Sequence, residues 1–148
     1  MKFDLHLAGR VNPHFGRPVA ARVKALRKQG CAVIHHEGIK DAKLLELYGR
    51  TRATVFATRA EGCGLPVIES LWMGVPCVCS DLPVLRENAD GGGCVPVAVN
   101  DAAAWREALR RVLTDDGAWR GLAAEAAARP LATWADCARQ LLAALPMA

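Results

Sequence analysis

The 148-residue sequence has few aromatic residues, which make up 5% of the chain, and no long uninterrupted hydrophobic run. No window approaches the roughly eighteen apolar residues that a membrane-spanning helix needs. The N-terminus also has no basic stretch that leads into an apolar run, so we expect neither a signal peptide nor a membrane span. We therefore expect a cytoplasmic protein, with the inner face of the cytoplasmic membrane as the alternative location.

The spacing that a zinc site requires is also absent, because none of the six cysteines forms a C-x-x-C pair. Four cysteines fall in expected strands, where free thiols behave as small hydrophobic residues: Cys31, Cys77, Cys79 and Cys94. Cys63 lies in a glycine-rich loop without an adjacent histidine that would activate it as a nucleophile. His35 and His36 point to opposite faces of a strand, so they cannot easily ligate one metal. We expect no metal site.

The chain is long enough, with 52% hydrophobic residues, to form one domain over residues 1–148 that buries roughly 70% of its unfolded surface. Its net charge of +4 suits phosphate-bearing ligands or an anionic membrane surface, and we expect no nucleic-acid partner. The basic face of a helix expected over residues 14–29 could lie on anionic lipid as a peripheral membrane contact. A solvated helix surface is the simpler interpretation.

Short apolar runs alternate with helical patterns along the chain. We expect strands at residues 3–8, 31–34, 53–57, 76–79 and 94–97. Helices lie between them, and three further helices form a C-terminal tail: one capped by Asp101, one that starts at Asp116 and one capped by Thr133. We expect Trp105, Trp119 and Trp134 in this tail to anchor the core. This alternation predicts an α/β fold, a doubly wound parallel sheet in the strand order 2-1-3-4-5 with helices on both faces. Ligands bind such sheets beyond the carboxyl ends of the strands.

The strongest functional pattern lies in residues 58–81, TRAEGCGLPVIESLWMGVPCVCSD. Gly62 and Gly64 permit backbone angles and close approaches that a Cβ would obstruct. Pro66 begins a helix, which Gly74 ends in a left-handed conformation. Free N–H groups at the start of such a helix receive a phosphate or another anion well. Apolar residues cover nearly the whole circumference of this helix, so we expect it to be buried against the sheet.

Two glutamates, Glu61 and Glu69, bracket the glycine loop and the start of the helix. Each has a structural explanation, because Glu61 could be a loop or capping acid and Glu69 could interact favourably with the helix macrodipole from the first turn. Eight residues apart around a glycine loop, the two acids form a sharper pattern than either forms singly.

Three stretches, residues 61–71, 74–78 and 80–87, closely resemble the donor-binding C-terminal half of retaining glycosyltransferases with the GT-B fold and a Glu, seven residues, Glu signature. Residues 3–9, 45–56 and 94–96 resemble further strands and helices of that family. The resemblance therefore covers most of the chain. It departs from the family at Ala57-Thr58, where Pro-Ser is common.

The resemblance implies a nucleoside diphosphate sugar as the donor, either a GDP- or a UDP-sugar, and a reaction without cofactor or metal that retains the anomeric configuration. Glu69 would accept hydrogen bonds from the ribose, and Glu61 would hold the transferred sugar and stabilise positive charge at its anomeric carbon. Backbone groups complete the implied site. Those expected at the phosphates or sugar are Gly62, Cys63, Gly64, Leu65 and Val67, and those expected at the base or the sheet edge are Gly38, Ile39, Lys40 and Gly9.

Members of the family also have a preceding strand and helix with diphosphate-binding cations, and an N-terminal domain that binds the acceptor. We expect this chain to lack both, to bind donor weakly and to transfer sugar negligibly alone; the acceptor would be a glycan or a lipid-linked sugar. Residues 81–87 resemble bacterial mannosyltransferases most, which favours GDP-mannose and polysaccharide biosynthesis. A non-catalytic nucleotide-binding or structural module and a sugar-nucleotide epimerase are the alternatives.

Overall fold

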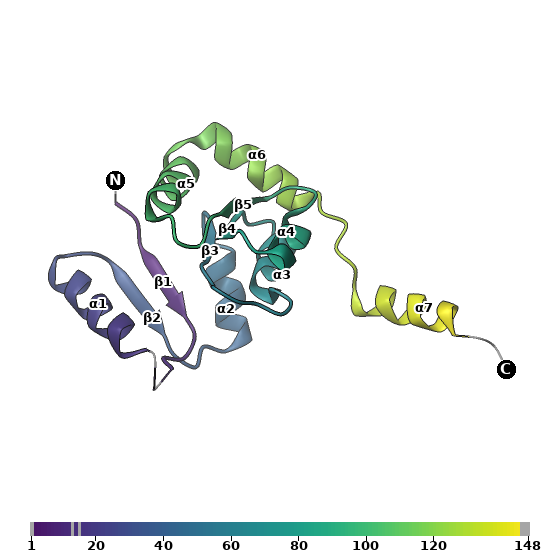
Figure 1. Cartoon of the computed structure of the whole chain (residues 1–148), viewed down its shortest axis with the longest axis horizontal. Coiled ribbons are helices and arrows are strands. Elements are labelled where there is room, and N and C mark those ends of the chain that lie inside the picture. Colours follow the sequence, from purple (N-terminus) through teal and green to yellow (C-terminus); the bar gives the residue numbers. More distant parts are fainter. Residues whose placement is uncertain (1, 13, 15, 146–148) are drawn as a thin grey trace. The chain divides into compact units, whose positions relative to one another are not determined.

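The computed structural model describes residues 2–12, 14 and 16–145 of the chain. The chain forms two compact units, residues 1–49 and 50–148, each with parallel strands and helices (Figure 1). The expected α/β class is confirmed, since strands and helices alternate from β1 to α5. One five-stranded sheet was expected, whereas the described residues form a two-stranded sheet, β1-β2, and a three-stranded sheet, β3-β4-β5. The predicted order holds within each sheet, and the link between strands 1 and 3 stays a prediction, as does the single domain.

The first unit is a β-α-β motif followed by a second helix. β1 (Leu5–Ala8) pairs in parallel with β2 (Val33–His36), and α1 (Arg17–Lys28) connects them before α2 (Asp41–Tyr48). Among the described residues of this unit, Val33 is the one hydrophobic side chain in the buried core. β1 is thus half exposed rather than buried as expected, and β2 begins two residues later than expected.

The second unit is built on β4 (Cys77–Ser80), a fully buried strand between β3 (Thr54–Phe56) and β5 (Cys94–Val97). Its helices are α3 (Leu65–Trp72), α4 (Pro83–Ala89), α5 (Ala102–Thr114), α6 (Asp116–Ala127) and α7 (Trp134–Ala144). The caps predicted at Asp101 and Thr133 are confirmed, because both side chains accept hydrogen bonds from backbone N–H groups of the following helix. Helix α6 begins at Asp116, as predicted, and the side chain of the preceding Asp115 caps it.

Two hydrophobic clusters cover the two faces of β4, because successive side chains of a strand point to opposite faces. One cluster contains Cys77, Cys79, Val67, Leu71, Leu85 and Ala126. The other contains Val78, Val97 and Val112, with Trp105 and Trp119 packed against it. Helices α3 and α4 therefore pack on one face of the sheet and α5 on the other. The thiols of Cys77 and Cys79 act as small hydrophobic groups, as expected, whereas Cys31 is exposed outside β2.

Helix α3 packs against the sheet, as expected, but it buries one face only although apolar residues cover nearly its whole circumference. Val67, Ser70 and Leu71 are buried and share one face, since they are three and four residues apart. Trp72 on the other side is 56% exposed. The helix begins at Leu65, one residue before the proline, and Gly74 follows it with φ +68°, as predicted.

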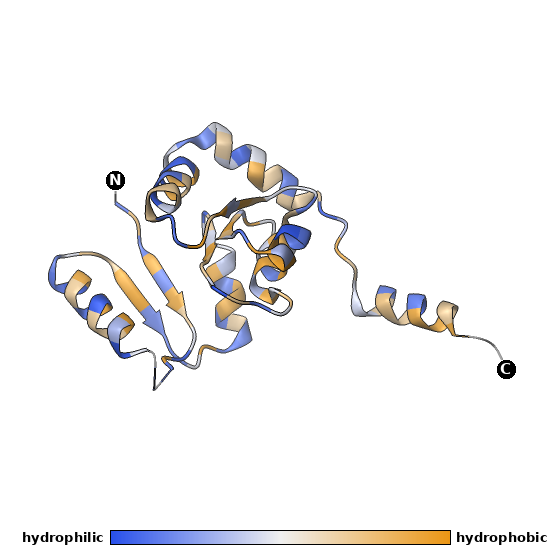
Figure 2. Ribbon diagram, in the orientation of Figure 1, coloured by the Kyte–Doolittle hydropathy of each residue, from blue (hydrophilic) through white to orange (hydrophobic). Residues whose placement is uncertain are grey.

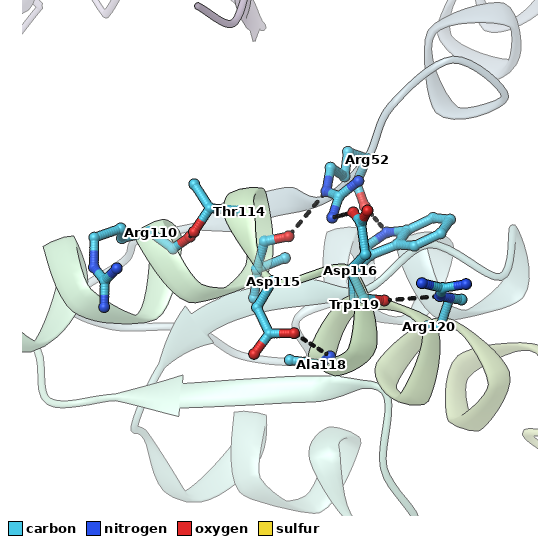
Figure 3. Close-up of polar contacts among 9 residues, drawn as sticks. Arg52, Arg110, Thr114, Asp115, Asp116, Ala118, Trp119 and Arg120 are labelled. Carbon is cyan, nitrogen blue, oxygen red and sulfur yellow. Dashed lines mark hydrogen bonds and ion pairs between the residues drawn. The ribbon is translucent and has the colours of Figure 1, made fainter. Parts of the chain in front are cut away.

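A side-chain staple fastens the start of β3 to α5 and α6 (Figure 3). The Arg52 guanidinium donates to the carbonyl of Val112 at 3.0 Å and pairs with the Asp116 carboxylate at 2.6 Å. It also lies 4.8 Å from the ring centroid of Trp119, whose indole N–H donates back to the Arg52 carbonyl at 2.8 Å. Trp119 is thus the core anchor that the sequence predicted.

Helix α7 combines hydrophobic and hydrophilic residues (Figure 2) and exposes nearly all of them. Trp134 at its start is 92% exposed, so the expectation that it anchors the core is wrong. A reciprocal pair of hydrogen bonds between Thr133 and Asp136 stabilises the start of the helix instead. Within the described part of the chain, no helix has the length and apolarity to cross a membrane.

Candidate functional site

The glycine loop, residues 61–64, connects the end of β3 to α3 and fits tightly against α4. Gly64 is the N-cap of α3 and has φ +74° and ψ +37°, a left-handed conformation. A Cβ at this position would lie 2.4 Å from Leu85 Cδ2 and 2.8 Å from Asn88 Nδ2. Glycine is therefore required at Gly64 by both conformation and space. Gly62 has open space around it, so packing does not require glycine there.

The Glu61 carboxylate folds back onto the amides of the glycine loop. Its Oε1 accepts hydrogen bonds from the N–H of Gly62 at 2.9 Å and of Cys63 at 3.5 Å. The hydrogen bond from Gly62 contributes most, and those from Gly64 and Cys63 add to it, so the pKa of Glu61 is lowered from its usual value. These amides thus donate to a carboxylate oxygen. An oxygen of a phosphate or of a sugar hydroxyl could take the place of that carboxylate oxygen.

Glu69 lies on the exposed side of α3, next to the buried Ser70. It is the fifth residue of the helix, so no acid occupies the first turn. The macrodipole explanation for Glu69 is therefore wrong, since that effect is confined to the terminal turn. Its expected role as a partner of the ribose hydroxyls stays a prediction.

Ser80, at the end of β4, holds the chain that leads into the glycine loop. Its hydroxyl donates to the carbonyl of Thr58 at 2.6 Å and accepts from the N–H of Thr58 at 2.9 Å. The Thr58 hydroxyl in turn donates to the Ala60 carbonyl at 2.7 Å. These bonds order the segment before Glu61 at the place where the family often has Pro-Ser.

Ser70 ties the buried face of α3 to the neighbouring strands. Its hydroxyl donates to the Val75 carbonyl at 2.8 Å and lies 2.6 Å from the hydroxyl of Thr54 on β3. A buried hydroxyl with its hydrogen bonds made fixes the position of the helix, because moving it would leave those groups unpaired. Helix α3, which carries Glu69, is therefore anchored on its buried face by the hydrogen bonds of Ser70 as well as by hydrophobic contacts.

One of the backbone amides expected to bind the donor already donates a hydrogen bond within the protein. The N–H of Val67 donates to the Gly64 carbonyl at 2.9 Å, which closes the first turn of α3. A contact from this amide to a ligand would need that bond to be shared or opened. Leu65 is 58% exposed at the start of the helix, and its expected role, like that of Val67, stays a prediction.

The remaining expected site residues lie in the first unit. Gly9 follows β1 with φ +137°, donates to the His36 carbonyl at 3.1 Å and accepts from His35 Nε2 at 2.8 Å. Gly38 has φ +66° in the turn after β2, and Lys40 is the N-cap of α2. His36 turns to the other side and lies 2.9 Å from His6 Nδ1, as expected for adjacent residues of a strand. The described residues include no group of three or more acidic, histidine or cysteine side chains that could hold a metal ion.

Residues 2–115 match the model of the family described as Glycosyl transferases group 1. The chain belongs to this family. The match extends from the residue before the first expected strand to the end of α5, so it includes the glycine loop, both glutamates and the loops of the first unit. The recognition made from the 61–71 motif is therefore confirmed.

Relatives of this glycosyltransferase chain are much longer than the chain itself. O-antigen chain mannosyltransferase B of Escherichia coli is 35% identical over 109 residues, which is 70% of this chain and 27% of the relative. Serotype-specific mannosyltransferase WbdA of Escherichia coli is 45% identical over 53 residues, 36% of this chain and 6% of the relative. The chain thus spans between 6% and 27% of these curated relatives.

Sucrose-phosphate synthase from Thermosynechococcus elongatus has a similar structure, with a TM-score of 0.74 and 25% identity over 96% of this chain and 39% of that one. This similarity, together with the family match, identifies the fold as the C-terminal half of a GT-B glycosyltransferase. The Rossmann-like architecture that the resemblance implied is confirmed.

Three residues that support the site were missed by the sequence analysis: Ser70, Ser80 and Asn88. The hydroxyls of Ser70 and Ser80 are buried and fully paired, and Asn88 donates from α4 to the Cys63 carbonyl at 2.7 Å. A serine within an apolar helix or strand was the available signal for the first two, since a buried hydroxyl needs a partner. No pattern in the sequence distinguishes Asn88 from any other polar residue of a short helix.

Proposed function

We propose that this chain supplies the donor-binding half of a retaining glycosyltransferase that uses a nucleoside diphosphate sugar. Membership of the family and the arrangement of the loop support this proposal. The observation that carries it is the Glu61 carboxylate on the amides of residues 62–64, because amides that hold one oxygen anion are suited to hold another.

The residues take the roles that the family pattern implies. The loop amides receive oxygens of the diphosphate or the sugar, and Glu69 accepts hydrogen bonds from the ribose hydroxyls. Glu61 leaves the amides, holds hydroxyls of the transferred sugar and stabilises the positive charge that develops at the anomeric carbon. Preorganised groups of this kind act on the charge of the transition state.

The printed names of the relatives favour a mannosyl donor. Two relatives from Escherichia coli and one from Salmonella typhimurium are mannosyltransferases, the last at 28% identity over 85 residues. We therefore propose GDP-mannose as the first donor to test and UDP-sugars as the comparison. In our proposal the acceptor is a glycan or a lipid-linked sugar, and the chain alone transfers sugar negligibly.

Titration calorimetry of the full chain with GDP, UDP and their sugars tests the proposal. We expect measurable binding of at least one nucleotide, and a loss of about three- to tenfold in affinity for Glu69→Ala, the contribution of roughly one net hydrogen bond. Glu107→Ala is the matched control, because Glu107 is an exposed helical glutamate whose carboxylate forms a surface ion pair with Arg110. Its affinity should equal that of the unmodified chain.

Two outcomes separate the alternatives. If no nucleotide binds, the donor-site proposal fails and a structural module remains. If nucleotide binds but Glu69→Ala and Glu107→Ala behave alike, Glu69 has no part in the site. Product analysis with donor alone would reveal an epimerase by a sugar of changed configuration, whereas hydrolysis by a transferase releases the unchanged sugar.

A further inference from the structure

The glycine loop is held from outside by one side chain of α4. Asn88 Nδ2 donates a hydrogen bond to the carbonyl of Cys63 at 2.7 Å. The same nitrogen lies where a Cβ of Gly64 would come within 2.8 Å of it. Asn88 therefore contacts the loop at the peptide bond that joins Cys63 to Gly64, on the side that faces α4.

The hydrogen bond from Asn88 to the Cys63 carbonyl also determines the direction of the Gly64 N–H in the same peptide group. A trans peptide is planar, so its C=O and N–H point in opposite directions, and the described residues contain no cis peptide. With the Cys63 carbonyl directed at Asn88, the Gly64 N–H is directed away from α4. Glu61 lies next to this residue, since its Cγ would be 3.8 Å from a Cβ of Gly64, and the Gly64 N–H is one of the amides that lower the pKa of Glu61.

We propose that Asn88 is a positioning residue for donor binding, because it orients the Cys63–Gly64 peptide so that the Gly64 N–H faces the anion-binding side of the glycine loop. This inference rests on the proposed function, in which that amide receives an oxygen of the donor. Asn88 touches no reacting atom itself.

Asn88 is in turn held in place by α6. Arg129, two residues after the end of α6, donates from Nη1 to the carbonyl of Asn88 at 3.1 Å and to that of Gly92 at 3.0 Å. Glu125, one turn earlier, accepts the N–H of Gly93 at 2.9 Å. A guanidinium and a carboxylate four residues apart thus clamp the segment between α4 and β5, which fixes the end of the helix that carries Asn88.

The test compares Asn88→Ala and Asn88→Asp with Asn100→Ala and Asn100→Asp in the full chain. Asn100 is exposed in the turn after β5, so its variants match the loss of an amide and the change of charge at a position outside the glycine loop and α4. Asn88→Asp keeps the shape of the side chain but replaces the donor by an oxygen that repels the Cys63 carbonyl. The measurements are nucleotide affinity by calorimetry, the Gly64 amide shift and the Glu61 carboxyl titration by NMR, and the thermal midpoint.

Nucleotide affinity should fall about three- to tenfold in Asn88→Ala, and at least as much in Asn88→Asp, with the Asn100 variants unchanged. The Gly64 amide shift should change and the pKa of Glu61 should rise toward its usual value in both Asn88 variants. Equal affinities of Asn88→Ala and Asn100→Ala, where the unmodified chain binds, would overturn the proposal. If the unmodified chain binds no nucleotide, the proposed function fails, and the NMR readouts alone decide whether Asn88 orients the peptide.

Discussion

The two β-α-β motifs of the chain follow the same plan and differ in how firmly they hold their loops. Helix α1 has 12 residues and buries none of them, whereas α3 has 8 and buries Val67, Ser70 and Leu71. The difference lies in the strands beneath. In the second unit, β4 has a strand on each side and a hydrophobic cluster on each face, while the sheet of the first unit has two strands. A central strand, more than helix length, determines how much a connecting helix buries.

The loops of the two units also differ in how closely they are packed. In the second unit the glycine loop touches α4 so closely that a Cβ at Gly64 would meet Leu85 and Asn88. In the first unit a Cβ at Gly9 or Gly38 would meet no atom of the described residues within 4 Å. We infer that the glycine loop is a preformed part of the site, whereas the space around the first unit's loops leaves room for a ligand.

The largest expected effect is on the core under α3. Leu71→Ala should destabilise the second unit by about 2–5 kcal/mol, because Leu71 is 1% exposed and its loss leaves a cavity next to Val67 and Cys79. Val19→Ala in α1, where Val19 is 57% exposed, should change stability by less than about 0.5 kcal/mol. Urea denaturation followed by circular dichroism measures both.

Tryptophan fluorescence assigns the transition to a unit, because all four tryptophans lie beyond residue 50: Trp72, Trp105, Trp119 and Trp134. Leu71→Ala should shift the fluorescence transition to lower urea. A shift of similar size for Val19→Ala would contradict the contrast between α1 and α3.

The second prediction separates two reasons why a position requires glycine, namely a left-handed backbone conformation and close packing against a neighbour. Gly64→Ala should destabilise the chain by about 2–4 kcal/mol, through strain at φ +74° and the close approach of Leu85 Cδ2 at 2.4 Å. Gly9→Ala carries strain at φ +137° but meets none of the described residues within 4 Å, so a loss of about 1–2 kcal/mol is expected. Thermal denaturation compares the two variants. Equal losses would show that the packing of Gly64 against α4 adds nothing to the cost of its conformation.

The sequence predicted the elements of both units well, because each depends on a local signal. The alternation of strands and helices, the caps at Asp101 and Thr133 and the left-handed Gly74 follow from hydrophobic period, side-chain oxygens and the absence of a Cβ. It failed where the partner of a residue decides the outcome. Nothing in the helical pattern of α3 or α7 says that Trp72 and Trp134 are exposed.

The residues of the candidate site can likewise be divided into those that the sequence predicted and those that it did not. The glycine loop and the two glutamates form a contiguous motif, so they could be found from the sequence. The partners of Ser80 and Asn88 could not, because each side chain acts across more than 20 residues on one carbonyl of the loop segment. A single hydrogen bond between distant segments leaves no periodicity to detect.

The smallest effect is a change of protonation in the glycine loop. The amides of residues 62–64 lower the pKa of Glu61, so its contribution to stability is present above the ordinary glutamate pKa of about 4.3 and is lost as the pH falls through the lowered value. A carbon-detected NMR titration should therefore place the pKa of the Glu61 carboxyl below the ordinary glutamate value. The Gly62 amide shift should follow the same titration, and Glu61→Gln should abolish that change. The Gly9 amide donates to the His36 carbonyl, which does not titrate, so its shift should stay flat between about pH 5 and 2. A Glu61 pKa at or above the ordinary value would mean that the carboxylate does not accept hydrogen bonds from the loop amides. The loop would then not be a preformed site for an oxygen anion.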